Sequence, residues 1–201
     1  MLRRRLLLSL ALAAALAASA PAAAAAATSA PAPASPPASA PAPAQIAQLL
    51  PDARLAGQGD FTWFTLKIYS AQLWVGLRGY RGDAPDAAPF VLDLRYARAL
   101  NGRKIADASA DQMQKIGAGS EAQRDAWRQT MRGIFPDVKE GQHISGVYMP
   151  GSGTRFYLDG RLLGVVPDAA FARAFFGIWL DPASTDRDLR DALLRDAAPS
   201  R

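Results

Sequence analysis

The chain has 201 residues, half of them hydrophobic, which is enough for one domain of ordinary size with its own core. It contains no cysteine, so disulfides, thiolate metal sites and a cysteine nucleophile are excluded. It contains a single histidine, which leaves few residues for a zinc site or for histidine-based catalysis. The net charge of +5 falls to +2 without the three arginines at positions 3–5, because 20 basic residues then face 18 acidic ones. That balance gives no reason to expect a nucleic acid or an anionic membrane as partner.

Residues 1–20 are predicted to be a cleaved signal peptide. The three arginines precede an apolar run of about 13 residues, which is too short for a comfortable membrane span. Ala18-Ser19-Ala20 fits a cleavage site, and the following Pro21 leaves a later cut near residues 25–27 as an alternative. An uncleaved anchor is a further alternative, against which the short length of the apolar run argues. We therefore expect a periplasmic or secreted protein with no stable membrane span.

Residues 21–45 are almost wholly alanine, proline and serine. Proline fixes φ and lacks a backbone donor, so this stretch is expected to be an extended, disordered linker. The folded domain is expected over residues 46–198.

The domain opens with two predicted strands, 54–59 and 61–75, separated by a tight turn or bulge at Gly57 and Gly59. A loop over residues 76–89 leads to a third strand, 90–98. Alternation predicts that one face of this strand carries four apolar side chains: Phe90, Leu92, Leu94 and Tyr96.

Two helices follow, and each is predicted to start with a capping box. Ser109 with Gln112 marks the first, which ends at the glycines near 117–119, and Ser120 with Gln123 marks the second, which ends before Pro136.

The remaining elements are three strands, at 143–149, 154–158 and 162–166, and two helices. Asp159-Gly160 is a strong hairpin signal, Pro167 and Asp168 open the first helix, and Thr185 is the expected cap of the last one. Runs of strands followed by runs of helices predict an α+β fold, with an antiparallel sheet covered by a helical layer on one face.

Motifs for hydrolytic or phosphate chemistry are weak. Gly151-Ser152-Gly153 lies between two strands without a following Gly-Lys-Ser/Thr, so a plain hairpin is expected rather than a phosphate loop. His143 lacks a second histidine or a cysteine and is expected at the surface or at an edge. The acidic residues form no evident catalytic pair, and neither a metal nor a cofactor is expected.

Arginine, tyrosine and threonine side chains on the predicted strands are the remaining candidates for chemistry. An arginine that faces a cleft would hold a carboxylate or enolate oxygen with a planar fork of donors, and hydroxyl groups would orient the same oxygen. The alternative is that they lie on the solvent face or pair with Asp93 and Asp159. The candidates are Arg54, Thr65, Tyr69, Arg95, Tyr96, Tyr148, Arg155 and Tyr157.

Two stretches resemble the chalcone isomerase family. The first resembles its first long hairpin: Gly57-x-Gly59-x-Phe61-x-x-Phe64-Thr65-x-x-x-Tyr69. The second resembles the bacterial, exported chalcone isomerase-like branch: Gly146-Val147-Tyr148, then Gly153-x-x-Phe156-Tyr157-x-x-Gly160-x-x-x-Gly164, then Phe171-Ala172-x-x-Phe175-Phe176-x-Ile178-Trp179-Leu180. The resemblance extends over about residues 46–195.

The resemblance implies an open-faced sandwich with a ligand cleft between sheet and helices. In the plant enzymes of this family an arginine stabilises a developing enolate, and a threonine and a tyrosine bind the ketone. The family's threonine falls on Thr65 and its arginine position on Ala53, next to Arg54, whereas its tyrosine falls near Ile105.

Three functional hypotheses follow from the resemblance. In the first, the cleft binds a small apolar or amphipathic ligand such as a fatty acid. The second is an intramolecular lyase or isomerase with Arg54 and Thr65 as its electrostatic groups, and the third is an interaction domain with a filled cleft. The expected ligand-binding residues are Tyr69, Arg95, Tyr96 and Tyr148. The sequence predicts no oligomeric state.

Overall fold

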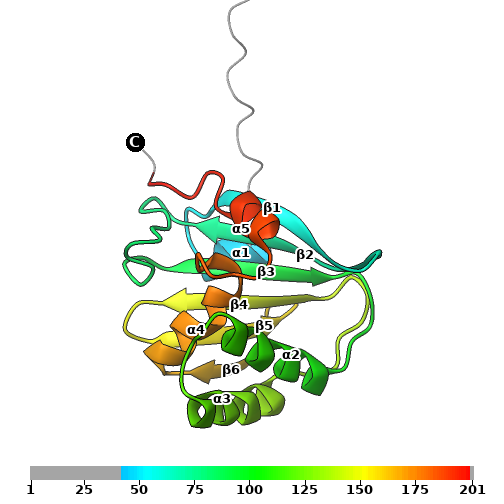
Figure 1. Cartoon of the computed structure of the whole chain (residues 1–201). Coiled ribbons are helices and arrows are strands. Elements are labelled where there is room, and N and C mark those ends of the chain that lie inside the picture. Colours follow the sequence, from blue (N-terminus) through cyan, green and yellow to red (C-terminus); the bar gives the residue numbers. More distant parts are fainter. Residues whose placement is uncertain (1–41, 200–201) are drawn as a thin grey trace, which may run out of the picture. The chain divides into compact units, whose positions relative to one another are not determined.

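The computed structural model describes residues 42–199, so the predicted signal peptide and most of the predicted linker lie outside the described residues. The described part contains six strands and five helices (Figure 1). The strands are β1 (Arg54–Trp63), β2 (Leu66–Val75), β3 (Phe90–Tyr96), β4 (His143–Met149), β5 (Gly153–Leu158) and β6 (Arg161–Val166). The helices are α1 (Ala44–Leu49), α2 (Gly102–Lys115), α3 (Glu121–Ile134), α4 (Ala169–Leu180) and α5 (Arg187–Leu193).

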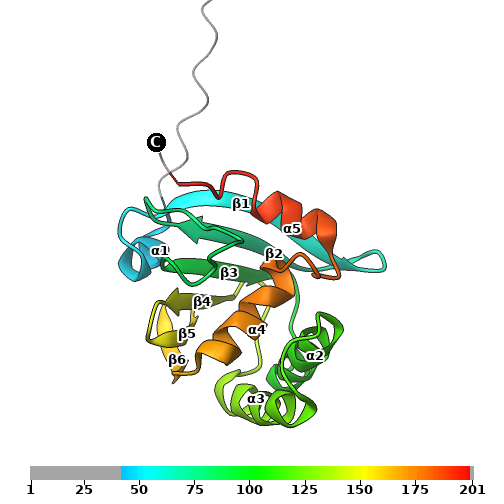
Figure 2. The same ribbon diagram turned by 60° about the vertical axis from the view of Figure 1, so that its left-hand side comes forward.

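The six strands form one antiparallel sheet in which neighbours in the sequence are neighbours in space, from β1 to β6. Helices α2 and α3 connect β3 to β4, and α4 and α5 follow β6. These four helices lie on the same face of the sheet (Figure 2). The α+β class, the antiparallel sheet and the helical layer are thus confirmed. No helix within residues 42–199 has the length and apolar character that crossing a membrane requires.

The alternation predicted for β3 is confirmed. Phe90 and Tyr96 are buried in the core between the sheet and the helical layer. Val91 points to the opposite face, where it joins a second apolar cluster with Ile46 of α1 and Trp74 of β2. Helix α1, whose first two residues were expected in the linker, therefore covers part of the outer face.

The first hairpin has the predicted bulge near Gly57, but it turns later than predicted. Strand β1 runs through both Gly57 and Gly59, with a bulge between Leu55 and Gly57, and the turn falls at Phe64 and Thr65. The glycines allow α5 to cross β1 closely. A Cβ on Gly57 would lie 2.0 Å from the carbonyl oxygen of Ala192. Their role in long-range packing cannot be distinguished locally from a turn signal.

The predicted helix starts are right twice and wrong twice, and the start at Asp168, which caps α4, is one of those confirmed. The capping box of Ser120 and Gln123 is confirmed at the start of α3. Helix α2 instead starts at Gly102, about two turns before Ser109. The Asn101 side chain caps it by accepting hydrogen bonds from the backbone N–H groups of Arg103 and Lys104. The Ser109 hydroxyl donates to the carbonyl of Ile105 at 2.9 Å within the helix. Helix α5 is capped by Asp186 rather than by the preceding threonine.

Candidate ligand-binding site

A cavity of about 420 Å³ lies between the helix-facing side of the sheet and helices α2, α4 and α5. Its volume falls in the range of small-molecule sites, so the space between sheet and helices is not filled by side chains. The walls are mainly apolar. The sheet contributes Leu94 and Ile144, α2 contributes Ile105, and α4 contributes Phe175 and Ile178.

Two tyrosines place hydroxyl groups in this apolar surrounding. Tyr69 of β2 and Tyr96 of β3 are register partners and both line the cavity, with ring centroids 6.1 Å apart. The Tyr69 hydroxyl accepts a hydrogen bond from the indole Nε1 of Trp179 at 3.0 Å, so its own proton is available to another acceptor. The Tyr96 hydroxyl has no hydrogen bond to another residue of the described part.

Burial governs the ionisation of both phenols. Desolvation raises the pKa of Tyr69 well above its usual range, although the hydrogen bond from Trp179 acts in the opposite direction. Desolvation, with a smaller contribution from neighbouring Tyr69, raises the pKa of Tyr96 in the same way. Both groups are therefore protonated at neutral pH and can donate a hydrogen bond to a ligand oxygen.

Polar residues gather at the rim, where α2 and the start of α5 approach each other. The Thr185 hydroxyl donates to the side-chain oxygen of Gln112 at 2.8 Å, and Asp186 accepts from the backbone N–H of Leu189 at 3.0 Å. Lys104 is exposed and is the one cation among the described residues that line the cavity. An anionic group that enters thus meets the cavity's one formal positive charge, Lys104, at the rim, where Asp186 supplies a negative charge.

Of the six residues chosen from the sequence as catalytic or ligand-binding, the structure brings Tyr69 and Tyr96 together in the cavity. Arg54 lies elsewhere, and its guanidinium donates to the carbonyls of Asp196 and Ala198 near the C-terminus. Thr65 is exposed in the β1–β2 turn. Neither Arg54 nor Thr65 lines the cavity, so the expected catalytic pair is not assembled there.

The other two predicted ligand-binding residues also lie outside the cavity. Arg95 is exposed on the outer face of β3, because it alternates with the inward-pointing Leu94 and Tyr96. Tyr148 does face the helical layer, but it stacks on Phe90 at 5.2 Å between ring centroids and lines a separate hollow of about 100 Å³.

Several cavity residues were not singled out as site residues by the sequence. The helical spacing of aromatic residues predicts a core position for Trp179, which is confirmed, and the residue lines the cavity as well. Lys104 carried no motif. Phe61 and Trp63 belong to the aromatic run of the first hairpin, which is the signal that could have identified them.

The outer face carries a buried polar cluster on adjacent strands. Asp93 is 2% exposed and accepts a hydrogen bond from the Ser145 hydroxyl at 2.5 Å, and its other oxygen lies 2.6 Å from Nδ1 of His143. The hydrogen bond to Asp93 raises the pKa of His143. His143 is thus half-buried on an interior strand, not at an edge. His143 and Ser145 each contact the Asp93 carboxylate, and no hydrogen bond joins these two residues of the described part. The cluster therefore stabilises the pairing of β3 with β4 and does not activate Ser145 as a nucleophile.

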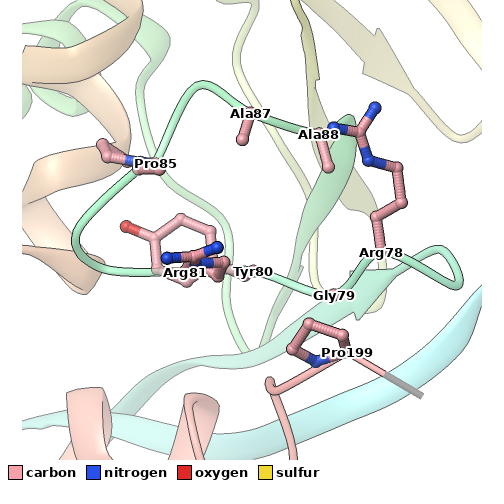
Figure 3. Close-up of a pocket in the computed structure, with 9 residues that line it drawn as sticks. Arg78, Gly79, Tyr80, Arg81, Pro85, Ala87, Ala88 and Pro199 are labelled. Carbon is pink, nitrogen blue, oxygen red and sulfur yellow. The ribbon is translucent and has the colours of Figure 1, made fainter. Parts of the chain in front are cut away.

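A hollow of about 230 Å³ lies beside the loop that follows β2 (Figure 3). Its arginines, Arg78 and Arg81, stand on different sides of the loop in Figure 3, and Arg81 is paired with Asp83 at 2.6 Å. The two guanidinium groups therefore do not converge on one ligand position. Residues 42–199 also contain no cluster of three or more acidic or histidine side chains suited to a metal ion.

Comparison with known proteins agrees with this architecture. Residues 43–195, well over half of the chain, match the sequence model of the chalcone isomerase-like family. The chain belongs to the chalcone isomerase-like family. This confirms the resemblance read from the glycine and aromatic motifs of the first hairpin and of the region after β3.

Two proteins illustrate the range of similarity to this chalcone isomerase-like domain. An uncharacterised protein of Haemophilus influenzae is 26% identical over 138 residues, which cover 69% of this chain and 66% of the relative. The chain thus spans just under two thirds of that relative's length. The crystal structure of a fatty-acid binding protein of Arabidopsis thaliana shares the fold, with a TM-score of 0.60 and 16% identity, over 73% of this chain and 89% of that one.

Proposed function

We propose that this chalcone isomerase-like domain binds one small apolar or amphipathic molecule, such as a fatty acid, in the cavity between sheet and helices. The observation that carries the proposal is an apolar cavity of about 420 Å³ whose wall holds two protonated tyrosine hydroxyls. Apolar walls provide affinity, and a few polar groups fix the orientation of a ligand. The shared fold with a plant fatty-acid binding protein supports the same ligand class.

The charges of the lining suggest how a fatty acid would be oriented. A carboxylate at the deep end would be desolvated without a lining cation, which is costly. At the rim it would remain hydrated and lie beside Lys104. We therefore place the carboxylate at the rim and the alkyl chain inside. The hydroxyls of Tyr69 and Tyr96 then donate hydrogen bonds to an uncharged oxygen atom, either of the ligand or of a water molecule.

The isomerase alternative has no comparable support. It relied on Arg54 and Thr65, which do not line the cavity, and Lys104 at the rim is the sole lining cation among the described residues. An enolate formed in the interior would lack the guanidinium on which that chemistry depends. An interaction domain with a filled cleft does not fit a cavity of this volume.

Titration with a fluorescent fatty acid, together with native mass spectrometry for a co-purifying lipid, tests the binding function. The variant Ala108→Trp adds an indole at a lining position of α2 that is exposed, so it narrows the cavity without disturbing the core. We expect it to weaken binding at least about tenfold, which corresponds to roughly 1.4 kcal/mol. Ala126→Trp places the same side chain at an exposed position of α3, outside the cavity, and is the matched control.

Two results would overturn the binding function. One is the absence of both a co-purifying lipid and saturable fatty-acid binding by the wild-type protein. The other is equal affinity of Ala108→Trp, Ala126→Trp and the wild type, which would place the bound molecule outside this cavity.

We also propose that the domain works outside the cytoplasm, in the periplasm or after secretion. The basic start, the short apolar run and the small residues at 18–20 support export. Fractionation of cells that express the full chain, with mass spectrometry of the purified N-terminus, tests this. A cytoplasmic protein with an intact N-terminus would contradict it.

A further inference from the structure

The tip of the β1–β2 hairpin carries exposed apolar side chains, where turns usually carry polar residues. Trp63 is 58% exposed, Phe64 89% and Leu66 49%. These three make up half of the exposed large hydrophobic side chains within residues 42–199. In Figure 2 the tip projects beyond the end of β3. An apolar patch at a projecting point marks an interaction surface.

Local conformation does not account for a phenylalanine at the turn. Phe64 has a φ of 55°, in the left-handed region that favours glycine or asparagine and disfavours bulky side chains. Its ring contact within the described part is an edge-on approach to Trp63, with centroids 5.4 Å apart. The phenylalanine is thus strained and largely unpacked, a combination found where function requires the residue.

The tip is continuous with the cavity. Trp63 belongs to both, because it lines the cavity and is more than half exposed. Leu66 is its register partner at the end of the hairpin. One step inward on the same face of β1, Phe61 stacks on Tyr69 with ring centroids 5.1 Å apart. An unbroken apolar track therefore leads from the exposed tip to the tyrosines of the cavity.

Charge at the tip is balanced. Residues 61–66 contain no charged side chain, and the flanking Asp60 and Lys67 form an ion pair at 2.8 Å. The polar side chains of this stretch are two threonines, which offer a protein partner few directional contacts. An uncharged, apolar projection with a tryptophan at its base matches the interface of a lipid bilayer, where indole rings are enriched.

We propose that the β1–β2 tip docks onto the surface of a lipid bilayer by inserting Trp63, Phe64 and Leu66 between lipids. The apolar ligand then passes between bilayer and cavity along the hairpin without crossing water. This passage rests on the proposed binding function, whereas docking itself does not. Because the tip carries no net charge, docking requires no anionic lipid.

Vesicle flotation of the full-length protein, purified in the form that accumulates in the cell, tests docking. Vesicles of phosphatidylcholine alone are compared with vesicles of phosphatidylethanolamine and phosphatidylglycerol. The variants are Phe64→Asn, which suits the positive φ, and Leu66→Ser. Leu77→Ser is the matched control, because Leu77 is 65% exposed but lies beyond the opposite end of β2. We expect wild type and control to float with both vesicles and each tip variant to partition about tenfold less.

Delivery of the probe separates docking from ligand binding. With cis-parinaric acid supplied from cyclodextrin, Phe64→Asn is expected to bind like the wild type, since Phe64 does not line the cavity. With the probe supplied from vesicles, its uptake by Phe64→Asn is expected to be slower than that of wild type and control. If the wild type floats but takes up no probe from cyclodextrin, the binding function fails and docking stands.

Docking is overturned if the wild type floats with neither kind of vesicle. It is also overturned if the tip variants float as well as the control. Sedimentation velocity identifies a different occupant of the tip. A wild type that is dimeric and does not float, beside a monomeric Phe64→Asn, would show that a second copy of the chain covers the patch and that no bilayer does.

Discussion

The hydroxyl of Tyr69 accepts a hydrogen bond from the indole Nε1 of Trp179 at 3.0 Å, joining the second strand to helix α4 across the cavity. Tyr69→Phe removes that acceptor and leaves a buried N–H without a partner. We expect a loss of about 1–2 kcal/mol in the free energy of unfolding, measured by urea denaturation. Tyr157→Phe is the control, because the Tyr157 hydroxyl has no hydrogen bond within the described residues, and it should change stability by less than about 0.5 kcal/mol. Equal stability of the two variants would contradict this role of Tyr69.

Lys104 should distinguish acids from alcohols if the carboxylate of a fatty acid lies at the rim. Exposed ion pairs contribute up to about 1 kcal/mol, so Lys104→Ala should weaken binding of a fatty acid by roughly threefold. Binding of the alcohol with the same chain should not change. Lys115→Ala, at an exposed position of the same helix outside the cavity, should leave both affinities unchanged. An equal effect on acid and alcohol would place the head group elsewhere.

Two glycine-to-alanine substitutions should act in opposite directions. A Cβ at Gly57 would lie 2.0 Å from the carbonyl oxygen of Ala192, so Gly57→Ala must displace α5 from β1 and should cost about 2 kcal/mol or more. Gly133 lies in α3 with nothing within 4 Å of the added atom, so Gly133→Ala should stabilise by about 0.5–1 kcal/mol. Thermal unfolding measures both, and a neutral Gly57→Ala would mean that the close helix crossing is not required.

The strain at Phe64 predicts a variant that is more stable than the wild type. Asparagine tolerates a φ of 55° far better than phenylalanine, so Phe64→Asn should raise the free energy of unfolding by about 1 kcal/mol. For a domain of this size that is a rise in Tm of roughly 3 °C. A lower Tm would show that the exposed ring stabilises the fold, and would remove one reason to assign it a role in docking.

The contact between His143 and Asp93 makes stability depend on pH. Its hydrogen bond to Asp93 raises the folded-state pKa of His143 above the unfolded value of 6.5, with smaller effects of burial, Arg95 and Asp159. The stabilisation is therefore complete below pH 6.5 and is lost as pH rises through the folded-state pKa. Urea denaturation of wild type and His143→Gln should show a stability difference that shrinks from mildly acidic to alkaline pH. A difference that stays constant or grows would contradict the charged contact.

Local patterns determined the fold class. Alternating side chains in residues 90–96, the capping box at Ser120 and the Asp159-Gly160 hairpin each depend on neighbours within a few residues, and each is confirmed. The same patterns, with the glycine and aromatic spacing of the first hairpin, were sufficient to indicate the chalcone isomerase-like family.

The site depended on contacts that no local pattern contains. Arg54 looked like a cation for a cleft, yet its guanidinium meets carbonyls more than 140 positions away in the sequence. Gly57 and Gly59 indicated a tight turn or a bulge, and a bulge does precede Gly57, but both glycines also make room for α5, which no local pattern contains.

The sequence alone determined an α+β domain with an antiparallel sheet, because strand and helix periodicities are properties of a few consecutive residues. Only the tertiary structure decided which polar groups face the cavity. A bulge reverses the face on which later residues of a strand lie, and long-range packing selects the helix that closes the space. Tyr69 and Tyr96 are neighbours because β2 pairs with β3 in that register, and Thr65 is exposed because the β1–β2 hairpin turns at residues 64–65.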